Sequence, residues 1–299
     1  MSGINTKSRS RGWPAWIFIL PVIDFVLLIR YLLRGKNVAL FNPKGVIAQQ
    51  QHTLMMFTLG ILLAVAIPTL FVLFYFAWKY RESNTKTKHA PESKHGRSLV
   101  LRMWLLPVTI MVVLASVMWP ATHKLVPQRA IASGTEPLTI QVISLRWKWL
   151  FLYPEQQIAS VNFVQIPLNR PVTFEMTADE TPMSSFWIPN LGGQLYTMTS
   201  HVNRLNLMAT KAGDYPGSSA EINGMGFAGM KFTARAGSAQ NFDNWVQSVK
   251  QSPDSLDTTA YNKLLQPSEN NPAAFYSSYE PNLYADVILK YTGPGGHTH

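Results

Sequence analysis

The segment Leu54–Trp78, LMMFTLGILLAVAIPTLFVLFYFAW, contains no charged residue over 25 positions. A second segment, Met103–Thr122, MWLLPVTIMVVLASVMWPAT, is uncharged over 20 positions. A helix of about 20 apolar residues crosses the hydrocarbon core of a bilayer, which is roughly 30 Å thick. Both segments therefore predict transmembrane helices, because each is longer than a buried helix of a soluble domain needs to be.

The connection between these two helices is rich in Lys and Arg. Short loops of this kind stay on the cytoplasmic side of a membrane, so we expect a helical hairpin within residues 37–124 whose loop faces the cytoplasm. The chain after Thr122 then lies outside, which in a bacterium is the periplasm. The basic residues are Lys79, Arg81, Lys86, Lys88, Lys94, Arg97 and Arg102, opposed only by Glu82 and Glu92.

Residues 1–36 have the features of a signal or anchor segment. Basic residues precede an apolar stretch, Trp13–Leu33, which Asp24 and Arg30 interrupt. A cleaved signal peptide and an uncleaved third helix both stay open. The lack of a small-residue cleavage motif and of a lipidation cysteine favours the uncleaved helix. Either alternative places the following residues outside, in agreement with the hairpin.

Charge is distributed unevenly along the chain. Lys and Arg number 26 against 16 Asp and Glu, and residues 1–124 hold 15 of the basic and 3 of the acidic residues. Because these charges flank apolar runs, they favour a phospholipid membrane as partner and not a nucleic acid. The absence of cysteine excludes disulfides, zinc–thiolate sites, iron–sulfur clusters and cysteine nucleophiles.

From Pro137 onward, apolar and polar residues alternate in short runs. Residues 138–145, LTIQVISL, are the clearest case, and turn residues separate this run from the next ones. Many short strands at such spacing predict an antiparallel β-sandwich or small barrel over residues 125–236. Further strands are expected at 161–166, 172–176, 195–198 and 205–208, and a turn at 213–217.

Residues 237–299 are expected to form a small helical region with a loose tail. Phe242, Trp245, Val246 and Val249 recur with the helical period. Further short helices are expected around residues 256–265 and within 275–291. The fold class is therefore a membrane-anchored all-β protein, in which a transmembrane helical hairpin precedes the sandwich and a small helical region follows it.

No motif in the chain indicates catalysis. None of the seven histidines pairs with another at a spacing of three or four residues, and no phosphate-binding loop, dinucleotide fingerprint or nucleophile–base pair is present. Asp179 and Glu180 are adjacent carboxylates in an expected turn, where such groups are usually solvated. The sequence thus predicts no catalytic residue and no metal site.

Two stretches stand out from this pattern. Arg146–Tyr153, RWKWLFLY, has three large amphipathic aromatic residues that either pack in a core or face the membrane surface and a partner. The other stretch combines Ser184–Gly192, SSFWIPNLG, with Gly217–Met230, GSSAEINGMGFAGM.

With the membrane hairpin, these stretches resemble subunit II of the haem–copper oxidases. In the cytochrome c oxidases of that family, a cupredoxin sandwich holds a dinuclear copper centre with the pattern H-S-F-W-x-P and then C-x-E-x-C-x-x-x-H-x-x-M. A centre of this kind needs soft thiolate and imidazole ligands. Here only the Glu and the Met keep the ligand type, so the resemblance implies a degenerate site that binds no copper. Its positions are Ser184, Ser219, Glu221, Asn223, Phe227 and Met230.

This loss is typical of the quinol-oxidase branch, and the chain is similar to subunit II of the cytochrome bo-type ubiquinol oxidases. The resemblance implies a non-catalytic subunit of an inner-membrane complex that oxidises ubiquinol, reduces oxygen to water and translocates protons. Haems and a mononuclear copper would reside in subunit I, and further small membrane subunits would complete the complex. Trp147, Trp149 and the loop Ser219–Met230 are the candidate contacts with subunit I.

Relatives in this branch place a glutamate, implicated in proton uptake by subunit I, just before the tryptophan that opens the second helix. In this chain Val100 and Leu101 occupy those positions, and the nearest loop carboxylate is Glu92. Two other functions stay open. One is a cytochrome c oxidase subunit with a disguised copper site, which the absence of cysteine opposes. The other is a membrane-tethered cupredoxin-like binding or assembly protein outside an oxidase.

Overall fold

The computed structural model describes residues 23–24, 27–28, 30–32, 34, 38–82, 84, 96–181 and 183–292. The chain forms two compact units: residues 1–38 with 56–115, and residues 39–55 with 116–299. Most of the predicted signal or anchor segment, most of the basic loop with Glu92, and the tail from residue 293 lie outside the described residues.

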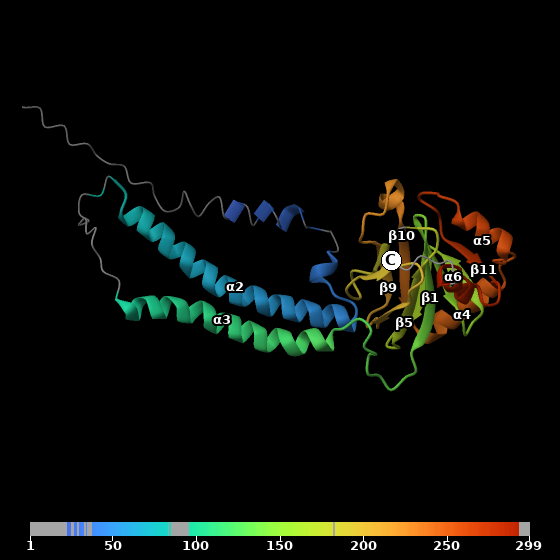
Figure 1. Cartoon of the computed structure of the whole chain (residues 1–299), viewed down its shortest axis with the longest axis horizontal. Helices are drawn as coiled ribbons and strands as arrows, with labels where there is room; N and C mark the ends of the chain where they lie inside the picture. Colours follow the sequence, from blue (N-terminus) through green and yellow to red (C-terminus); the bar gives the residue numbers. More distant parts are fainter. Residues whose placement is uncertain are drawn as a thin grey trace, which may run out of the picture. The chain divides into compact units, whose positions relative to one another are not determined.

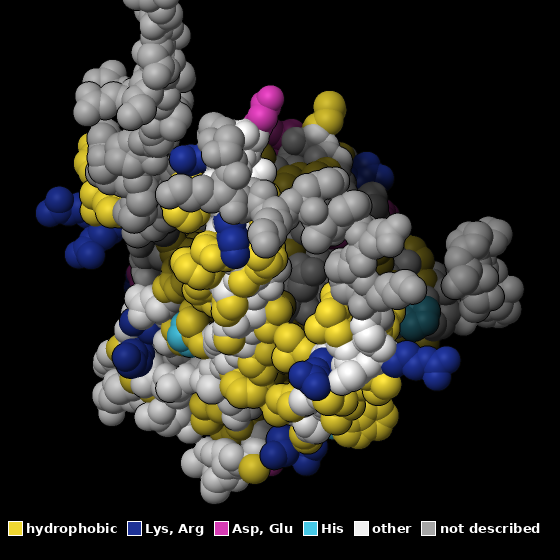
Figure 2. Space-filling view, turned by 90° about the vertical axis from the view of Figure 1, so that its left-hand side faces the viewer, with side chains coloured by type: hydrophobic (Ala, Val, Ile, Leu, Met, Phe, Trp, Pro, Cys, Tyr) yellow, Lys and Arg dark blue, Asp and Glu magenta, His cyan; other side chains and the backbone are white. Residues whose placement is uncertain are grey.

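Two long helices confirm the predicted apolar pair. Helix α2 spans Val46–Lys79 and helix α3 spans Arg97–Lys124, and both are long and apolar enough to cross a membrane. Large side chains along them are exposed: Phe71 by 71%, Trp104 by 70% and Trp119 by 72%. Figure 2 shows hydrophobic side chains over much of the face turned to the viewer, with Lys and Arg among them. Such surfaces are stable in lipid, where no water has to be ordered around them.

The second unit contains a sandwich of two sheets (Figure 1). The first sheet has six strands in the order β11-β3-β2-β1-β5-β8, and the second has five in the order β4-β10-β9-β6-β7. The predicted sandwich is thus confirmed, but β1 pairs with β5, and β4 with β10, in parallel, so neither sheet is purely antiparallel. The strands of the first sheet are β1 (Leu138–Leu145), β2 (Lys148–Tyr153), β3 (Ile158–Val161), β5 (Val172–Ala178), β8 (Asn203–Leu207) and β11 (Ala274–Tyr276). Those of the second are β4 (Phe163–Pro167), β6 (Ser184–Trp187), β7 (Leu195–Thr197), β9 (Gly213–Ser219) and β10 (Lys231–Gly237).

Two local predictions are wrong, each for a non-local reason. The run expected as one strand at 161–166 is divided by Asn162, whose backbone has φ +52° and whose side-chain oxygen accepts a hydrogen bond from the Trp149 amide at 2.9 Å. The chain changes sheets there, from β3 to β4. The expected turn at 213–217 is strand β9, which tolerates Pro216 because β6 pairs only with Ser218 and Ser219.

Strand β2 shows that both faces of the first sheet are buried from solvent. All six of its residues are buried. Trp149, Phe151 and Tyr153 point into the core between the sheets, while Leu150 and Leu152 join a second core on the outer face. Each fully buried side chain of this size stabilises the fold by about 1.5–3 kcal/mol, so this strand contributes to both cores.

The C-terminal residues build that second core. Helices α5 (Thr258–Leu265) and α6 (Leu283–Thr292) place Tyr261, Leu265 and Val287 against the outer face, and α4 (Ala239–Lys250) packs at the edge of the first core. The predicted first and second helices are confirmed. The run within 275–291 holds strand β11 as well as α6, and β11 extends the first sheet beside β3 (Figure 1).

The first turn of α2 is attached to the sandwich through main-chain hydrogen bonds. The amides of Val46 and Ala48 donate to the carbonyls of Met208 and Leu191 at 3.1 and 3.0 Å, and the amide of Lys44 donates to Asn190 at 2.8 Å. These amides would otherwise have no partner within the helix. The loops that follow β6 and β8 therefore fix the point at which α2 begins.

Candidate functional site

Three of the predicted degenerate copper-site positions meet in the interior of the sandwich. Ser184 lies on β6, and Asn223 and Met230 lie on the loop between β9 and β10. The Asn223 side-chain amide donates to the Ser184 hydroxyl at 2.7 Å and to the Met230 sulfur at 3.1 Å. All three residues are at most 7% exposed. Strand and loop are thus joined by a buried amide, at the place where the family pattern puts a metal.

The remaining positions contribute mainly through the backbone. The Ser219 hydroxyl donates to the Glu221 carbonyl at 2.9 Å and accepts from the Ser185 amide at 3.4 Å. The Phe227 amide donates to the Gly224 carbonyl at 3.2 Å within the short 3₁₀ turn Met225–Gly229. The structure therefore brings all six positions to one loop and the strand beside it, but only three of their side chains meet.

The donor set does not fit the dinuclear copper centre that the fold family implies. The site has one thioether and no thiolate or imidazole, the Glu221 carbonyl already accepts a hydroxyl proton, and the Asn223 amide presents N–H groups. N–H donors repel a cation, and soft ligands are required to hold copper. Across the described residues, no group of three or more His, Cys, Asp and Glu is placed to hold a metal ion.

Trp147 lies over the loop and not in a strand. It occupies the turn between β1 and β2 with φ +61°, and its ring covers the backbone at Gly224 and Gly226. A Cβ at Gly226 would overlap the ring, so glycine is required there for this contact. The side chain of Trp147 remains partly exposed.

Trp149, the other predicted contact with subunit I, needs a correction. Its side chain is fully buried, with ring centroids 5.3 Å from Phe186 and 5.9 Å from Phe232. A residue in the core between two sheets cannot touch another subunit. The alternative of core packing therefore holds for Trp149.

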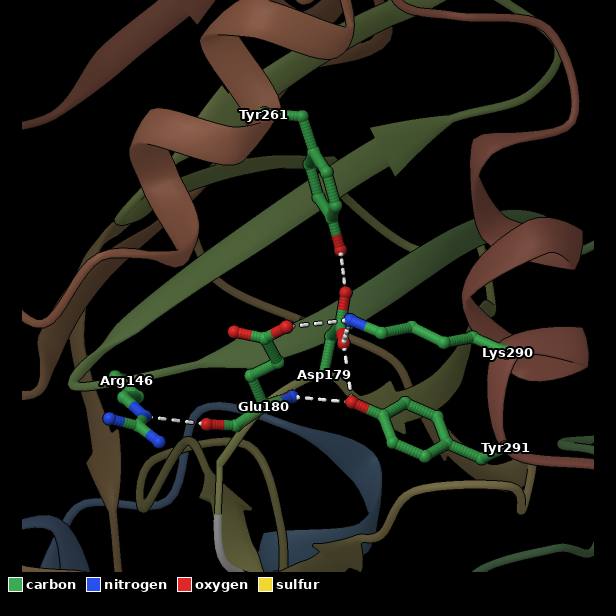
Figure 3. Close-up of polar contacts among 6 residues, drawn as sticks. All are labelled: Arg146, Asp179, Glu180, Tyr261, Lys290 and Tyr291. Carbon is green, nitrogen blue, oxygen red and sulfur yellow. Dashed lines mark hydrogen bonds and ion pairs between the residues drawn. The ribbon is translucent and has the colours of Figure 1, made fainter. Parts of the chain in front are cut away.

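A buried carboxylate that the sequence did not reveal lies at the end of β5. Asp179 is 1% exposed and accepts hydrogen bonds from the hydroxyls of Tyr261 and Tyr291 at 2.6 and 2.7 Å and from Lys290 at 2.9 Å (Figure 3). The expectation that this acidic pair is solvated is wrong for Asp179. It holds better for Glu180, whose side chain is 44% exposed and bonds Lys290 at 2.8 Å. Only the fold could show this, because the donors follow in the chain by some 80 to 110 residues.

The protonation of this cluster predicts loss of stability at alkaline pH. Burial, together with the hydrogen bonds to Asp179, raises the pKa of Tyr261 and of Tyr291. Burial lowers the pKa of Lys290, but its bonds to Glu180 and Asp179 raise that pKa by more. The folded chain therefore holds these protons more tightly than the unfolded chain, so its free energy of unfolding falls as the pH rises above about 10.

Urea unfolding of the full chain in detergent, followed by tryptophan fluorescence at about pH 8 and about pH 11, checks this expectation. Replacing both Tyr261 and Tyr291 with Phe is expected to reduce the alkaline loss. An equal loss in that variant would contradict the assignment. Lys148 has the opposite effect on the pH dependence of stability, because burial lowers its pKa in the folded chain.

The positions at which the family resemblance implies a proton-uptake glutamate are on α3. Val100 and Leu101 are 45% and 70% exposed there. Their apolar side chains cannot carry a proton, and Glu92 lies outside the described residues. This part of the chain therefore offers no described carboxylate at those positions.

Comparison with known proteins identifies the family. The model of the COX Aromatic Rich Motif matches residues 250–295, the segment that contains α5, β11 and α6. The cytochrome bo(3) ubiquinol oxidase subunit 2 of Pseudomonas putida is 42% identical over 283 residues, covering 95% of this chain and 88% of that protein. The ubiquinol oxidase subunit 2 of Acetobacter aceti is 39% identical over 87% of this chain and 85% of its own length.

Among solved structures, the periplasmic domain of subunit II of cytochrome oxidase (CoxB) of Bradyrhizobium japonicum matches with a TM-score of 0.36 and 21% identity, covering 44% of this chain and 99% of that domain. The sequence matches cover most of both chains at well above 30% identity. The chain therefore belongs to the family of ubiquinol oxidase subunit 2 proteins.

Proposed function

We propose that this chain is the non-catalytic subunit II of a proton-translocating terminal ubiquinol oxidase, in which haems, a mononuclear copper and the quinol site reside in subunit I. The observation that carries the proposal is the pair of hydrogen bonds that the Asn223 side-chain amide donates to Ser184 and Met230. A domain whose metal position holds an amide has no means of accepting electrons from cytochrome c. Electrons from ubiquinol must then enter the complex through another subunit.

The proposed role is structural. The hairpin of α2 and α3 packs against subunit I and against further small membrane subunits in the bacterial inner membrane, and the sandwich lies in the periplasm. Trp147 and the loop Ser219–Met230 contact subunit I. This assignment is supported by two apolar side chains of the loop, Ile222 and Met225, which are 77% and 90% exposed. Side chains of this kind at an exposed tip favour a protein contact.

Oxygen uptake by the complex, purified through this chain in mild detergent, tests the proposal. Uptake is expected with ubiquinol and not with reduced cytochrome c. Uptake with cytochrome c would show that the copper argument is wrong. If no haem-containing subunit co-purifies and no uptake is seen, the chain is a membrane-tethered binding or assembly protein instead.

Substitution of Trp147 tests the contact itself. Trp147→Ala is expected to lower the amount of subunit I recovered with this chain, because truncating an aromatic side chain at the centre of an interface weakens binding by about 2 kcal/mol, roughly 30-fold. The ratio of the two subunits after affinity purification measures this effect. Trp245→Ala, which removes a partly buried tryptophan from α4, is the matched control and should leave the ratio unchanged. An unchanged ratio in Trp147→Ala would limit Trp147 to packing on its own loop.

A further inference from the structure

The short 3₁₀ turn Met225–Gly229 is held between two residues from distant parts of the chain. On one side, the Trp147 ring covers Gly224 and Gly226. On the other side lies Asn270, from the aromatic-rich segment (residues 250–295). A Cβ built on Gly229 would lie 2.8 Å from the Asn270 side-chain oxygen and 3.0 Å from its backbone nitrogen, so the two backbones are in close contact. The loop of the former copper position therefore has a neighbour that belongs to the C-terminal region.

Asn270 is itself fixed to the sandwich. It has φ +53°, and the next residue, Asn271, accepts a hydrogen bond on its carbonyl from the Asn162 side chain at 2.9 Å. Asn162 is 6% exposed and binds the Trp149 amide with its other side-chain atom. The turn that touches Gly229 is thus anchored to the point where the chain passes from one sheet to the other.

The second attachment is made beside Trp147. Lys148 is 1% exposed, and its ammonium group donates to the carbonyls of Leu264 and Gln266 at 2.8 and 2.7 Å. These carbonyls lie at the C-terminal end of α5, where a cation satisfies acceptors that the helix leaves free. Arg146 on the other side of Trp147 donates to the Glu180 carbonyl at 2.7 Å, next to the Asp179 cluster (Figure 3). Both neighbours of Trp147 in the sequence are therefore tied to the aromatic-rich segment, directly or through Asp179 and Glu180.

We infer that the aromatic-rich segment is the clamp that positions the loop Ser219–Met230. It holds the turn Met225–Gly229 from one side through Asn270 and fixes Trp147 on the other side through Lys148. Among the described residues, no group of His, Cys, Asp and Glu is placed to hold a metal ion that could position this loop instead. The clamp itself does not depend on the proposed function. The inference rests on that function only for the role of the loop, because the clamp determines how Ile222 and Met225 are presented to a partner.

Hydrogen–deuterium exchange of the full chain in detergent micelles, without other subunits, tests the clamp. Asn270→Gly removes the side chain that contacts Gly229 and keeps a residue that tolerates φ +53°. Lys148→Met keeps an unbranched side chain, one atom shorter, and removes the donors to α5. Both variants are expected to raise exchange in the peptide 219–230 about ten-fold, since local opening follows the loss of the contacts that hold a segment. Glu155→Gln is the matched control, because it removes a long exposed ion pair with Arg170, 3.8 Å apart, outside the aromatic-rich segment.

The strand β1 provides the internal reference in the same experiment. Faster exchange in the loop with unchanged exchange in 138–145 supports the clamp. Unchanged exchange in the loop of both variants overturns it, and so does an equal acceleration of loop and strand, which would mean general unfolding. Recovery of subunit I with the unmutated chain is measured separately, so failure of the proposed function does not alter the exchange result.

Discussion

A variant with Ser184→His, Ser219→Cys, Asn223→Cys and Phe227→His is expected to bind a dinuclear copper centre, whereas the natural chain is expected to bind none. The four changes supply the two thiolates and two imidazoles that are missing, and Met230 and the Glu221 carbonyl are already in place. The structure favours this result because the Asn223 side chain already lies within hydrogen-bond distance of both Ser184 and Met230. Soft ligands at such separations select copper.

Copper content after dialysis, together with the visible absorption of copper–thiolate bonds, measures this outcome. A three-substitution variant that keeps Asn223 is the matched control, because it lacks one of the two thiolates that the dinuclear centre requires. Introducing an imidazole ring at the buried Ser184 costs about 1–3 kcal/mol, which metal binding must offset. Phe227 is only partly buried, and there one ring replaces a larger one. If the four-substitution variant folds and takes up no copper, the six positions are not a former metal site.

The resemblance to the family pattern predicts these six positions from sequence, because most of them follow one another at fixed spacing. Glu221, Asn223, Phe227 and Met230 share a single loop, Ser219 directly precedes that loop at the end of β9, and only Ser184 comes from a distant strand. The long apolar runs of α2 and α3 and the alternation of 138–145 were equally local signals, and the structure confirms them. A pattern that a segment carries by itself survives folding, because its neighbours need only accept the face that it presents.

The features that the sequence missed depend on partners far away in the chain. Trp147 and Trp149 are two residues apart, but the turn at Trp147 separates them, so one covers a loop and the other enters the core. Pro216 favours a turn by local sequence, but it is accommodated in strand β9 because β6 pairs only with Ser218 and Ser219. Asp179 reads as a solvated carboxylate until α5 and α6 bring their tyrosines to it. In each case a contact between distant residues overrides the local preference.

Asp179→Ala is expected to lower the free energy of unfolding by about 3 kcal/mol. The carboxylate accepts hydrogen bonds from two tyrosine hydroxyls of the aromatic-rich segment, at 2.6 and 2.7 Å, and each bond to a charged acceptor contributes about 1.5–3 kcal/mol. Lys290 loses less, because its side chain is 42% exposed and it keeps Glu180 as a partner. The main effect is therefore on the tyrosines, which anchor α5 and α6 to the end of β5.

Glu180→Gln is the matched control for that substitution. It removes an adjacent carboxylate that binds the same lysine, but the pair is about half exposed, and exposed ion pairs contribute only about 0–1 kcal/mol. Asp179→Asn should fall between the two, since the amide keeps one acceptor oxygen while losing the charge. Urea unfolding of the full chain gives the three free energies, and the rate of tryptic cleavage after Lys263 reports opening of α5 directly. Equal effects of the Asp179 and Glu180 substitutions would mean that charge alone matters, whereas a large difference places the stability in the buried carboxylate and its two tyrosines.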